Sequence, residues 1–254
     1  MQIALFQPLS PAGDQQAALD ALTPALMAAG AATADVLVAP ETYFPGYNVT
    51  DPGAGALTLD AITDLLAPFV RRAGCALVIG YAERVATENG DTVYNSAIAL
   101  DATGAVLGNY RKIQLYGPRE NRLYTPGDSY VQITLNGVPC ALLICYDVEF
   151  QPHVAALAAM GAQVVLVPTA NMLPFTHVSR VLVPANAAAT RTTIVYANYC
   201  GTEGDLTYAG HSVIAGPHGE ILAEAGGHPA LLIAKIPQPD PARASSQAED
   251  FRKV

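Results

Sequence analysis

Apolar segments of two kinds alternate along the chain. Short runs rich in aliphatic residues predict strands, and they lie at Gln2 to Leu5, Val36 to Ala39, Cys75 to Tyr81, Ala141 to Ile144, Val164 to Val167 and Ile194 to Ala197. Between these runs, apolar residues recur at helical spacing, first as Leu19, Leu22 and Leu26, then as Leu59, Ile62, Leu66 and Phe69, and then as Val154 and Leu157 after Pro152. This alternation of strand and helix is typical of an α/β fold.

Two further pairs of segments predict β-hairpins. The first pair, Tyr94 to Leu100 and Ala105 to Tyr110, flanks Asp-Ala-Thr-Gly, and the second, Ser212 to Ala215 and Glu220 to Ala223, flanks Gly-Pro-His-Gly. Hairpin strands are antiparallel, whereas strands joined through a helix are parallel, so we expect mixed sheets. Residues 1–110 and 131–235 repeat a similar order of elements, which indicates two facing halves.

The chain is expected to form one domain over residues 1–236. The remaining segment, residues 237–254, contains Pro239, Pro241 and a polar stretch, and it lacks the periodicity of a core element. It is therefore predicted to be an extended arm. Such an arm either packs on a partner subunit or forms a loose terminus, and the sequence leaves both open.

The composition narrows the class of protein. With 254 residues, 51% apolar and 14% charged, the chain can bury a large core. The net charge of -9 is spread over isolated Asp and Glu, which argues against nucleic acid as a partner. No apolar run reaches the roughly 18 residues that span a bilayer, and the start is predicted to be a strand rather than a leader. We expect a cytoplasmic protein without a membrane partner.

The cysteines give no signal for a disulfide framework or for a metal site. There is no CxxC pair and no histidine at zinc-ligand spacing near any of them, and they are scattered as Cys75, Cys140, Cys145 and Cys200.

Three reactive side chains directly follow apolar strands. Glu41 ends Val-Leu-Val-Ala-Pro-Glu, Lys112 ends Gly-Asn-Tyr-Arg-Lys, and Cys145 ends Ala-Leu-Leu-Ile-Cys. Ligands gather outside the carboxyl ends of strands in α/β sheets, so the three side chains are expected to converge. A thiol can attack a carbonyl, a carboxylate can move the proton, and an ammonium can stabilise the oxyanion. The combination predicts acyl transfer.

Taken singly, each of these residues has a more ordinary interpretation. A cysteine that ends a strand is usually part of the core, Glu41 could cap a helix or turn, and Lys112 could be a solvated charge. A neighbouring ammonium, or the start of the helix after Pro152, would favour the Cys145 thiolate. The joint pattern, rather than any one residue, indicates a nucleophilic cysteine.

The segments around these residues resemble the signature blocks of the nitrilase superfamily of carbon-nitrogen hydrolases. The blocks are Ala-Pro-Glu41-Thr-Tyr-Phe-Pro-Gly-Tyr, Tyr-Arg-Lys112-Ile-Gln-Leu and Leu-Ile-Cys145-Tyr-Asp-Val-Glu-Phe, and similarity extends to about Lys235. The resemblance implies a four-layer αββα sandwich of two mixed β-sheets, a homodimer or larger homo-oligomer, and no cofactor. It also implies a Glu-Lys-Cys mechanism through a thioester acyl-enzyme.

The resemblance also assigns roles to single residues. Glu41 is similar to the general base, Lys112 to the oxyanion-stabilising lysine and Cys145 to the nucleophile, with the backbone N–H of Tyr146 as the second oxyanion donor. Glu120 looks like the second glutamate that orients the lysine and the substrate. The alternative for Glu120 is an exposed glutamate on a loop.

A substrate pocket is expected beside these residues. Its candidate lining residues are Tyr47, Tyr116, Tyr146 and Asn171, for which core packing is the alternative. Asn171 is expected to face the substrate more than Met172 or Phe175. The histidines fall in no triad or metal-ligand spacing and are expected at surface or structural positions, namely His153, His177, His211, His218 and His228.

A small carboxamide is the predicted substrate, because the segment from Thr169 to Tyr208 looks closest to amidase-like members. The alternative is an N-carbamoyl amino acid, whose carboxylate would need a cation, and the candidates by sequence are Arg119, Arg122 and Arg180. A nitrilase is a third option. The chain departs from the family pattern at Gln151 to His153 and at Asn186 to Arg191, which affects the substrate class and the subunit contact.

Two further classes of protein are disfavoured. A ligand-binding scaffold with the same fold would not need intact Glu41, Lys112 and Cys145. A redox-sensing thiol protein would need a resolving cysteine near Cys145, but Cys140 lies an odd number of residues away and points to the opposite face of a regular strand.

Overall fold

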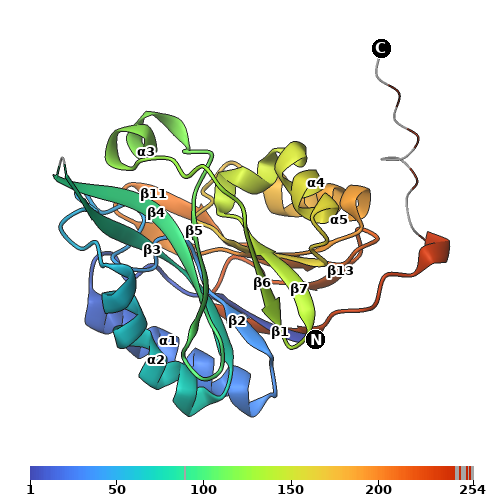
Figure 1. Ribbon diagram of the computed structural model, residues 1–254, viewed down its shortest axis with the longest axis horizontal. Coiled ribbons are helices and arrows are strands. Elements are labelled where there is room, and N and C mark those ends of the chain that lie inside the picture. The colour runs from blue at the N-terminus through green and yellow to red at the C-terminus, as the bar shows by residue number, and fades with distance from the viewer. Residues whose placement is uncertain (89, 244–245, 247–249, 251, 253–254) are drawn as a thin grey trace.

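The computed structural model describes residues 1–88, 90–243, 246, 250 and 252. In this part of the chain, two six-stranded sheets pack face to face (Figure 1). The first sheet has the order β14 (Ala230–Lys235), β1 (Gln2–Gln7), β2 (Val36–Val38), β3 (Ala76–Thr87), β4 (Gly90–Leu100) and β5 (Val106–Arg111). The second has the order β13 (Ile221–Glu224), β12 (Val213–Ala215), β9 (Thr193–Ala197), β8 (Val164–Pro168), β7 (Val138–Leu142) and β6 (Val131–Leu135). A separate hairpin consists of β10 (Cys200–Glu203) and β11 (Leu206–Ala209).

Helices cover the outer faces of both sheets (Figure 1). The first sheet is covered by α1 (Gln15–Ala31) and α2 (Leu59–Ala73), and the second by α4 (Gln151–Ala159) and α5 (Val183–Thr190). The short helix α3 (Gly117–Leu123) lies beyond the end of β5. The remaining helical turns are η1 (Cys145–Glu149), η2 (Val178–Leu182) and η3 (Pro241–Arg243). The expected four-layer αββα sandwich of two mixed sheets is therefore confirmed.

The alternation of side chains along each strand separates two layers of core. Ile3 and Val36 of the first sheet belong to the core that also contains the second sheet. Their neighbours Ala4 and Leu37 point the other way and pack in the core beneath α1 and α2. Because a shift of one residue would exchange these faces, burial on both sides specifies the register of the strands.

The strand directions place the ends of several strands at one edge of the sandwich. Strands β1, β2 and β3 are parallel, as are β7, β8 and β9, whereas β3–β4–β5 and β9–β12–β13 are antiparallel. The predicted hairpins and mixed sheets are thus confirmed.

The two halves do not separate completely, because β14 leaves the second half and pairs with β1 in the first sheet.

After β14 the chain leaves the sandwich. Ile236 N donates a hydrogen bond to Met1 O at 3.0 Å, and residues 237–243 are exposed and include the short turn η3. Residues 244, 245, 247–249, 251, 253 and 254 of the predicted arm lie outside the described residues. The boundary at residue 236 and the intersubunit role of the arm stay predictions.

Within the described residues, no helix is both long enough and apolar enough to cross a membrane. Nor do these residues contain a group of three or more His, Cys, Asp or Glu side chains arranged to hold a metal ion.

Candidate active site

The ends of β2, β5 and β7 bring Glu41, Lys112 and Cys145 to one site. Lys112 directly follows β5, and Glu41 and Cys145 each lie three residues beyond their strands. Lys112 Nζ is 2.6 Å from Glu41 Oε1, and Glu41 and Lys112 both act electrostatically on the Cys145 thiol. The Lys112 and Glu41 side chains are fully buried, and Cys145 is 8% exposed. The sequence expectation that three strand ends converge therefore corresponds to a real cluster of side chains.

The loop that carries Glu41 lies tightly against β3, and a glycine permits this. Gly80 N donates to Pro40 O at 2.9 Å, and a Cβ atom at position 80 would lie 2.3 Å from Thr42 N and 2.5 Å from Glu41 Cα. Any larger residue at position 80 would displace the Glu41 backbone. On the other side of the loop, the Tyr199 hydroxyl donates to Glu41 O at 3.0 Å. The backbone that carries the Glu41 side chain is thus held from both sides.

The two carboxylate oxygens of Glu41 have different surroundings. Oε1 accepts hydrogen bonds from Lys112 Nζ at 2.6 Å and from Asn95 Nδ2 at 2.7 Å. Oε2 is buried and has no hydrogen-bond partner among the described residues. Burial raises the pKa of Glu41, and the adjacent Lys112 ammonium opposes this only in part. One oxygen therefore remains available to accept a proton. Sequence reasoning missed Asn95, which lies inside β4 in a hairpin with no motif around it.

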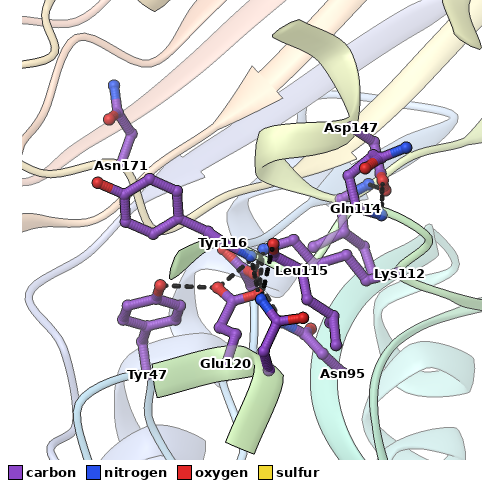
Figure 2. Close-up of polar contacts among 12 residues, drawn as sticks. Tyr47, Asn95, Lys112, Gln114, Leu115, Tyr116, Glu120, Asp147 and Asn171 are labelled. Carbon is purple, nitrogen blue, oxygen red and sulfur yellow. Dashed lines mark hydrogen bonds and ion pairs between the residues drawn. The ribbon is translucent and has the colours of Figure 1, made fainter. Parts of the chain in front are cut away.

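Glu120 occupies the other side of the lysine. It lies on α3 and is fully buried, so the alternative of an exposed loop glutamate is wrong. Its carboxylate is 2.9 Å from Lys112 Nζ and accepts hydrogen bonds from the Tyr47 hydroxyl at 2.7 Å and from Tyr116 N at 2.9 Å. Figure 2 shows Tyr47 and Lys112 reaching Glu120 from different directions. These contacts hold both the carboxylate and the lysine in place.

The Lys112 ammonium keeps its charge although it is buried. Burial by itself lowers the pKa of the lysine, but the carboxylates of Glu120 and Glu41 raise it well above its ordinary value. The site therefore holds a permanent, fully desolvated cation, and its two ion pairs restrain the position of the ammonium. A cation of this kind is suited to stabilise negative charge that develops on a bound carbonyl oxygen.

Cys145 begins the turn η1 in an uncommon backbone conformation. Its φ of 45° lies in the left-handed region, where residues other than glycine occur rarely and often at functional sites. Burial, and then the charge of Glu41, raise the pKa of the thiol well above its usual value. The Lys112 ammonium lowers the pKa of the thiol, as expected of a neighbouring cation, but desolvation and the Glu41 carboxylate outweigh it. Helix α4 begins only at Gln151, so its N-terminus is not at the sulfur.

Asp147 braces the turn that presents the cysteine. One carboxylate oxygen accepts hydrogen bonds from Ile144 N at 3.0 Å and from the Tyr110 hydroxyl at 2.8 Å, and the other accepts from Gln114 N at 2.7 Å. These bonds tie the start of η1 to β5 and to the segment after Lys112, as Figure 2 shows for Asp147 and Gln114. Sequence reasoning gave Asp147 no role, although an acidic residue two positions after the cysteine was a visible signal.

A cavity of about 230 Å³ opens beside Cys145. All four predicted lining residues border it, namely Tyr47, Tyr116, Tyr146 and Asn171. Met172 and Phe175 border it as well, so the expected preference for Asn171 over these two is not seen; the Asn171 Nδ2 donates to Phe175 O at 2.9 Å. His177 also lines the cavity, which corrects the expectation that it is only a surface or structural residue. Glu149 was missed, since its position in η1 gives no signal of its own.

None of the arginines considered for binding a substrate carboxylate lines this cavity. Arg119 donates to Val49 O at 2.7 Å, and its guanidinium lies 5.5 Å from the centre of the Tyr47 ring. Arg122 is exposed, and Arg180 is 3.8 Å from Glu224 at the surface. The described residues that line the cavity include no lysine and no arginine.

The fold and the arrangement of the site are those of a hydrolase with an αββα core, and the comparison with known families agrees. Residues 2–244 match the family model described as carbon-nitrogen hydrolase, so the chain belongs to this family. Two curated relatives are similar over most of the chain. One is a protein from Pseudomonas protegens described as a hydrolase in the pqqF 5' region, with 37% identity over 93% of this chain and 82% of the relative. The other is an (R)-stereoselective amidase from a Pseudomonas species, with 36% identity over 76% of this chain and 69% of the relative.

Solved structures of an amidase from Nesterenkonia sp. AN1 are similar in fold and in sequence. A variant of that amidase in complex with butyramide has a TM-score of 0.84 and 37% identity, over 93% of this chain and 91% of that chain. Another variant shows covalent addition of the acetamide moiety of fluoroacetamide at its active-site cysteine. It has the same TM-score and the same identity, over 93% of this chain and 90% of that chain. With the family match, these relatives show that the protein is an amidohydrolase, as expected.

Proposed function

We propose that the protein hydrolyses a small carboxamide to the acid and ammonia through a thioester on Cys145. The observation that carries this proposal is the geometry of Glu41 beside a buried thiol at a small cavity. One Glu41 oxygen is paired to Lys112, and the other has no partner in the part of the chain that the structure describes. That arrangement supplies a nucleophile, a base and a cation within one desolvated site.

Acylation begins from a neutral thiol, because burial raises the pKa of Cys145. The Sγ atom attacks the amide carbon while Glu41 takes the thiol proton, so charge develops on the substrate oxygen rather than on sulfur. Lys112 and the backbone N–H of Tyr146 stabilise that oxyanion. Glu41 then delivers the proton to the nitrogen, the C–N bond breaks, and ammonia leaves with the thioester formed.

Deacylation uses the same groups with water as the nucleophile. Glu41 takes a proton from water, the oxygen of water bonds to the acyl carbon, and the C–S bond breaks. The proton returns to sulfur, which restores the thiol and releases the acid. Glu120 pairs with Lys112 and positions the ammonium, and Tyr47 and Tyr116 N in turn fix the Glu120 carboxylate.

The cavity favours a small amide over an N-carbamoyl amino acid. Its volume of about 230 Å³ suits a small acyl group, and aromatic side chains form much of its wall. An N-carbamoyl amino acid would place a carboxylate where no described lining residue is lysine or arginine. The Nesterenkonia amidase, which binds butyramide, supports the same class of substrate.

The proposal is tested by ammonia release from butyramide, N-carbamoyl-alanine and butyronitrile, measured with the native protein and with Cys145→Ala. We expect release from butyramide to exceed release from the other two compounds and to vanish in Cys145→Ala, whose circular dichroism should match that of the native protein. Release that persists in Cys145→Ala would overturn the mechanism. Release from N-carbamoyl-alanine alone would overturn the substrate class.

We also infer assembly as a homodimer or larger homo-oligomer. Apolar side chains are exposed on the second helical layer. They are Phe150 and Met160, at the two ends of α4, and Val181 in η2. Analytical ultracentrifugation over a range of concentrations checks this inference. A sedimentation coefficient of a monomer at all concentrations would contradict it.

A further inference from the structure

One carboxylate in the cavity has no part in the proposed reaction. Glu149 is the last residue of η1, the turn that Cys145 begins, and it lines the same cavity together with Tyr116 and His177. A turn of this type rises about 2 Å per residue, so the two Cα atoms lie roughly 8 Å apart along its axis. Glu149 is therefore within reach of the far end of a short acyl chain bound at Cys145.

The charge of Glu149 is not compensated inside the cavity. Among the described residues, none donates a hydrogen bond to its carboxylate, and none places a cationic nitrogen within 4.0 Å of it. His177 acts on it electrostatically from a greater distance. The Lys112 ammonium is engaged by Glu41 and Glu120, at 2.6 and 2.9 Å. Burial raises the pKa of Glu149, which is the sign expected for a carboxylate that lacks solvation and a close partner.

The other acidic side chains of the site differ from Glu149 in this respect. Glu120 accepts hydrogen bonds from three groups, and Asp147 accepts three as well. Glu41 is bonded through one oxygen and keeps the other for the proton. A carboxylate that borders the substrate cavity without such bonds is available to a group that arrives with the substrate.

We propose that Glu149 binds a cationic amine on the acyl part of the substrate, so that the preferred amides carry a protonated amino group. This inference rests on the proposed amidase activity and specifies its substrate class. An ammonium beside Glu149 would form a charge-assisted hydrogen bond, and the rings of Tyr116, Tyr146 and Phe175 that line the same cavity can stabilise a cation further. A neutral amide of the same shape would leave the carboxylate unpaired.

Matched substrate pairs test this proposal. Each amino amide is compared with the alkyl amide that has a methyl group in place of the amine: glycinamide with propanamide, β-alaninamide with butanamide, and 4-aminobutanamide with pentanamide. The ratio of kcat/KM within each pair is measured near neutral pH for the native protein and for Glu149→Gln, which keeps the shape and removes the charge. As a control, Glu224→Gln removes one charge on β13, outside the residues that line the cavity.

We expect the native protein to favour the amine in at least one pair, and Glu149→Gln to lower that ratio by about tenfold to a hundredfold, as for the loss of a hydrogen bond between charged groups. Glu224→Gln should leave the ratio unchanged. An equal ratio in native protein and Glu149→Gln, with Cys145-dependent release of ammonia from the alkyl amides, would overturn the role of Glu149 and keep the amidase activity.

A binding measurement makes the test independent of turnover. Calorimetric titration of Cys145→Ala with 4-aminobutanamide and pentanamide, repeated with Cys145→Ala combined with Glu149→Gln, gives the preference for the amine directly. The preference should be present in the first protein and absent in the second. If neither protein distinguishes the two amides, the proposal is wrong whatever the activity.

Discussion

Arg111 and Lys112 are neighbours in the sequence, and each pairs with a buried glutamate. The Arg111 guanidinium donates to both oxygens of Glu83 at 2.8 Å, and the Ser96 hydroxyl donates to the same carboxylate. Lys112 pairs with Glu41 through one oxygen and leaves the other without a partner among the described residues. The first pair is complete and partly solvated, since Arg111 is 37% exposed, whereas the second is incomplete and fully buried.

This difference changes the acidity of the two glutamates in opposite directions. Burial raises the pKa of Glu83, but hydrogen bonds from Arg111 and Ser96 outweigh it and lower the pKa overall. For Glu41, burial dominates and the pKa is raised. A carboxylate whose oxygens are all bonded stays ionised and stabilises the fold, whereas one that is buried and partly bonded can exchange a proton. Similar residues therefore form a structural pair on β3 and β5 and a reactive pair at the strand ends.

The largest expected effect concerns the two glutamates. Glu41→Gln removes the proton acceptor, so kcat/KM for butyramide should fall by about a hundredfold to ten-thousandfold. Glu83→Gln should leave it nearly unchanged, because Glu83 has no contact with the cavity. Steady-state ammonia release from both variants gives the comparison. Equal losses would mean that Glu41 acts as a structural residue.

A smaller loss of activity is expected when the two cations, Lys112 and Arg111, are replaced. Lys112→Met removes the oxyanion-stabilising charge and should lower the rate of acylation by about a hundredfold or more. Arg111→Met should retain most of the rate. Single-turnover kinetics on folded protein measure acylation, and circular dichroism at the assay temperature checks the fold, because Lys112→Met leaves two buried carboxylates unpaired. An unchanged acylation rate in folded Lys112→Met would exclude the assigned role.

The pH profile is expected to follow the raised pKa of Glu41. The base must be ionised, so kcat/KM should decline on the acid side around a pKa above the ordinary glutamate value of about 4.3. Lys112 has a raised pKa and should cause no alkaline decline below about pH 10. The profile is measured with butyramide, and Glu83→Gln serves as the control that should superimpose on the native curve. A decline on the acid side with an apparent pKa at or below the ordinary glutamate pKa would contradict the desolvation of Glu41.

The smallest effect is expected in stability rather than in activity. Glu83→Gln should lower the free energy of unfolding by about 1 to 2 kcal/mol near neutral pH, a modest value because solvent screens the exposed part of Arg111. The folded-state pKa of Glu83 is lowered, so its stabilisation is present above the unfolded value of about 4.3 and is lost as pH falls through the folded value. Urea denaturation at neutral and acidic pH measures the difference. A difference that persists in acid would show that charge is not its cause.

Most of the fold could be predicted from local pattern. The parallel strands are apolar runs buried on both faces, and α1 and α2 bury apolar residues at helical spacing, so the positions of these elements follow from periodicity. The pairing of β14 with β1 and the helix α3 could not be predicted in this way. Strand β14 has a mostly half-exposed pattern, and Glu120 of α3 is buried through contacts with Lys112 and with Tyr47, which is distant in the chain.

The convergence of the three side chains could be predicted because reactive residue types coincide with strand ends. Glu41, Lys112 and Cys145 each follow an apolar run, and that placement carries information about where they meet. The hydrogen bond from Asn95 to Glu41 and the position of Glu149 in the cavity wall depend instead on tertiary packing, which a single sequence does not display. The protonation state of Cys145 could not be predicted for the same reason, since the balance between the ammonium and desolvation is visible only when burial is known.

Detection of the thioester on Cys145 tests the proposed nucleophilic catalysis most directly. The native protein is mixed with butyramide, quenched with acid within the first turnover, digested and examined by mass spectrometry. We predict a mass increase equal to one butyryl group, confined to the peptide that contains Cys145 and absent from Cys145→Ala. Ammonia release from Cys145→Ala at the native rate, or an acyl group attached to a different residue, would contradict nucleophilic catalysis by Cys145.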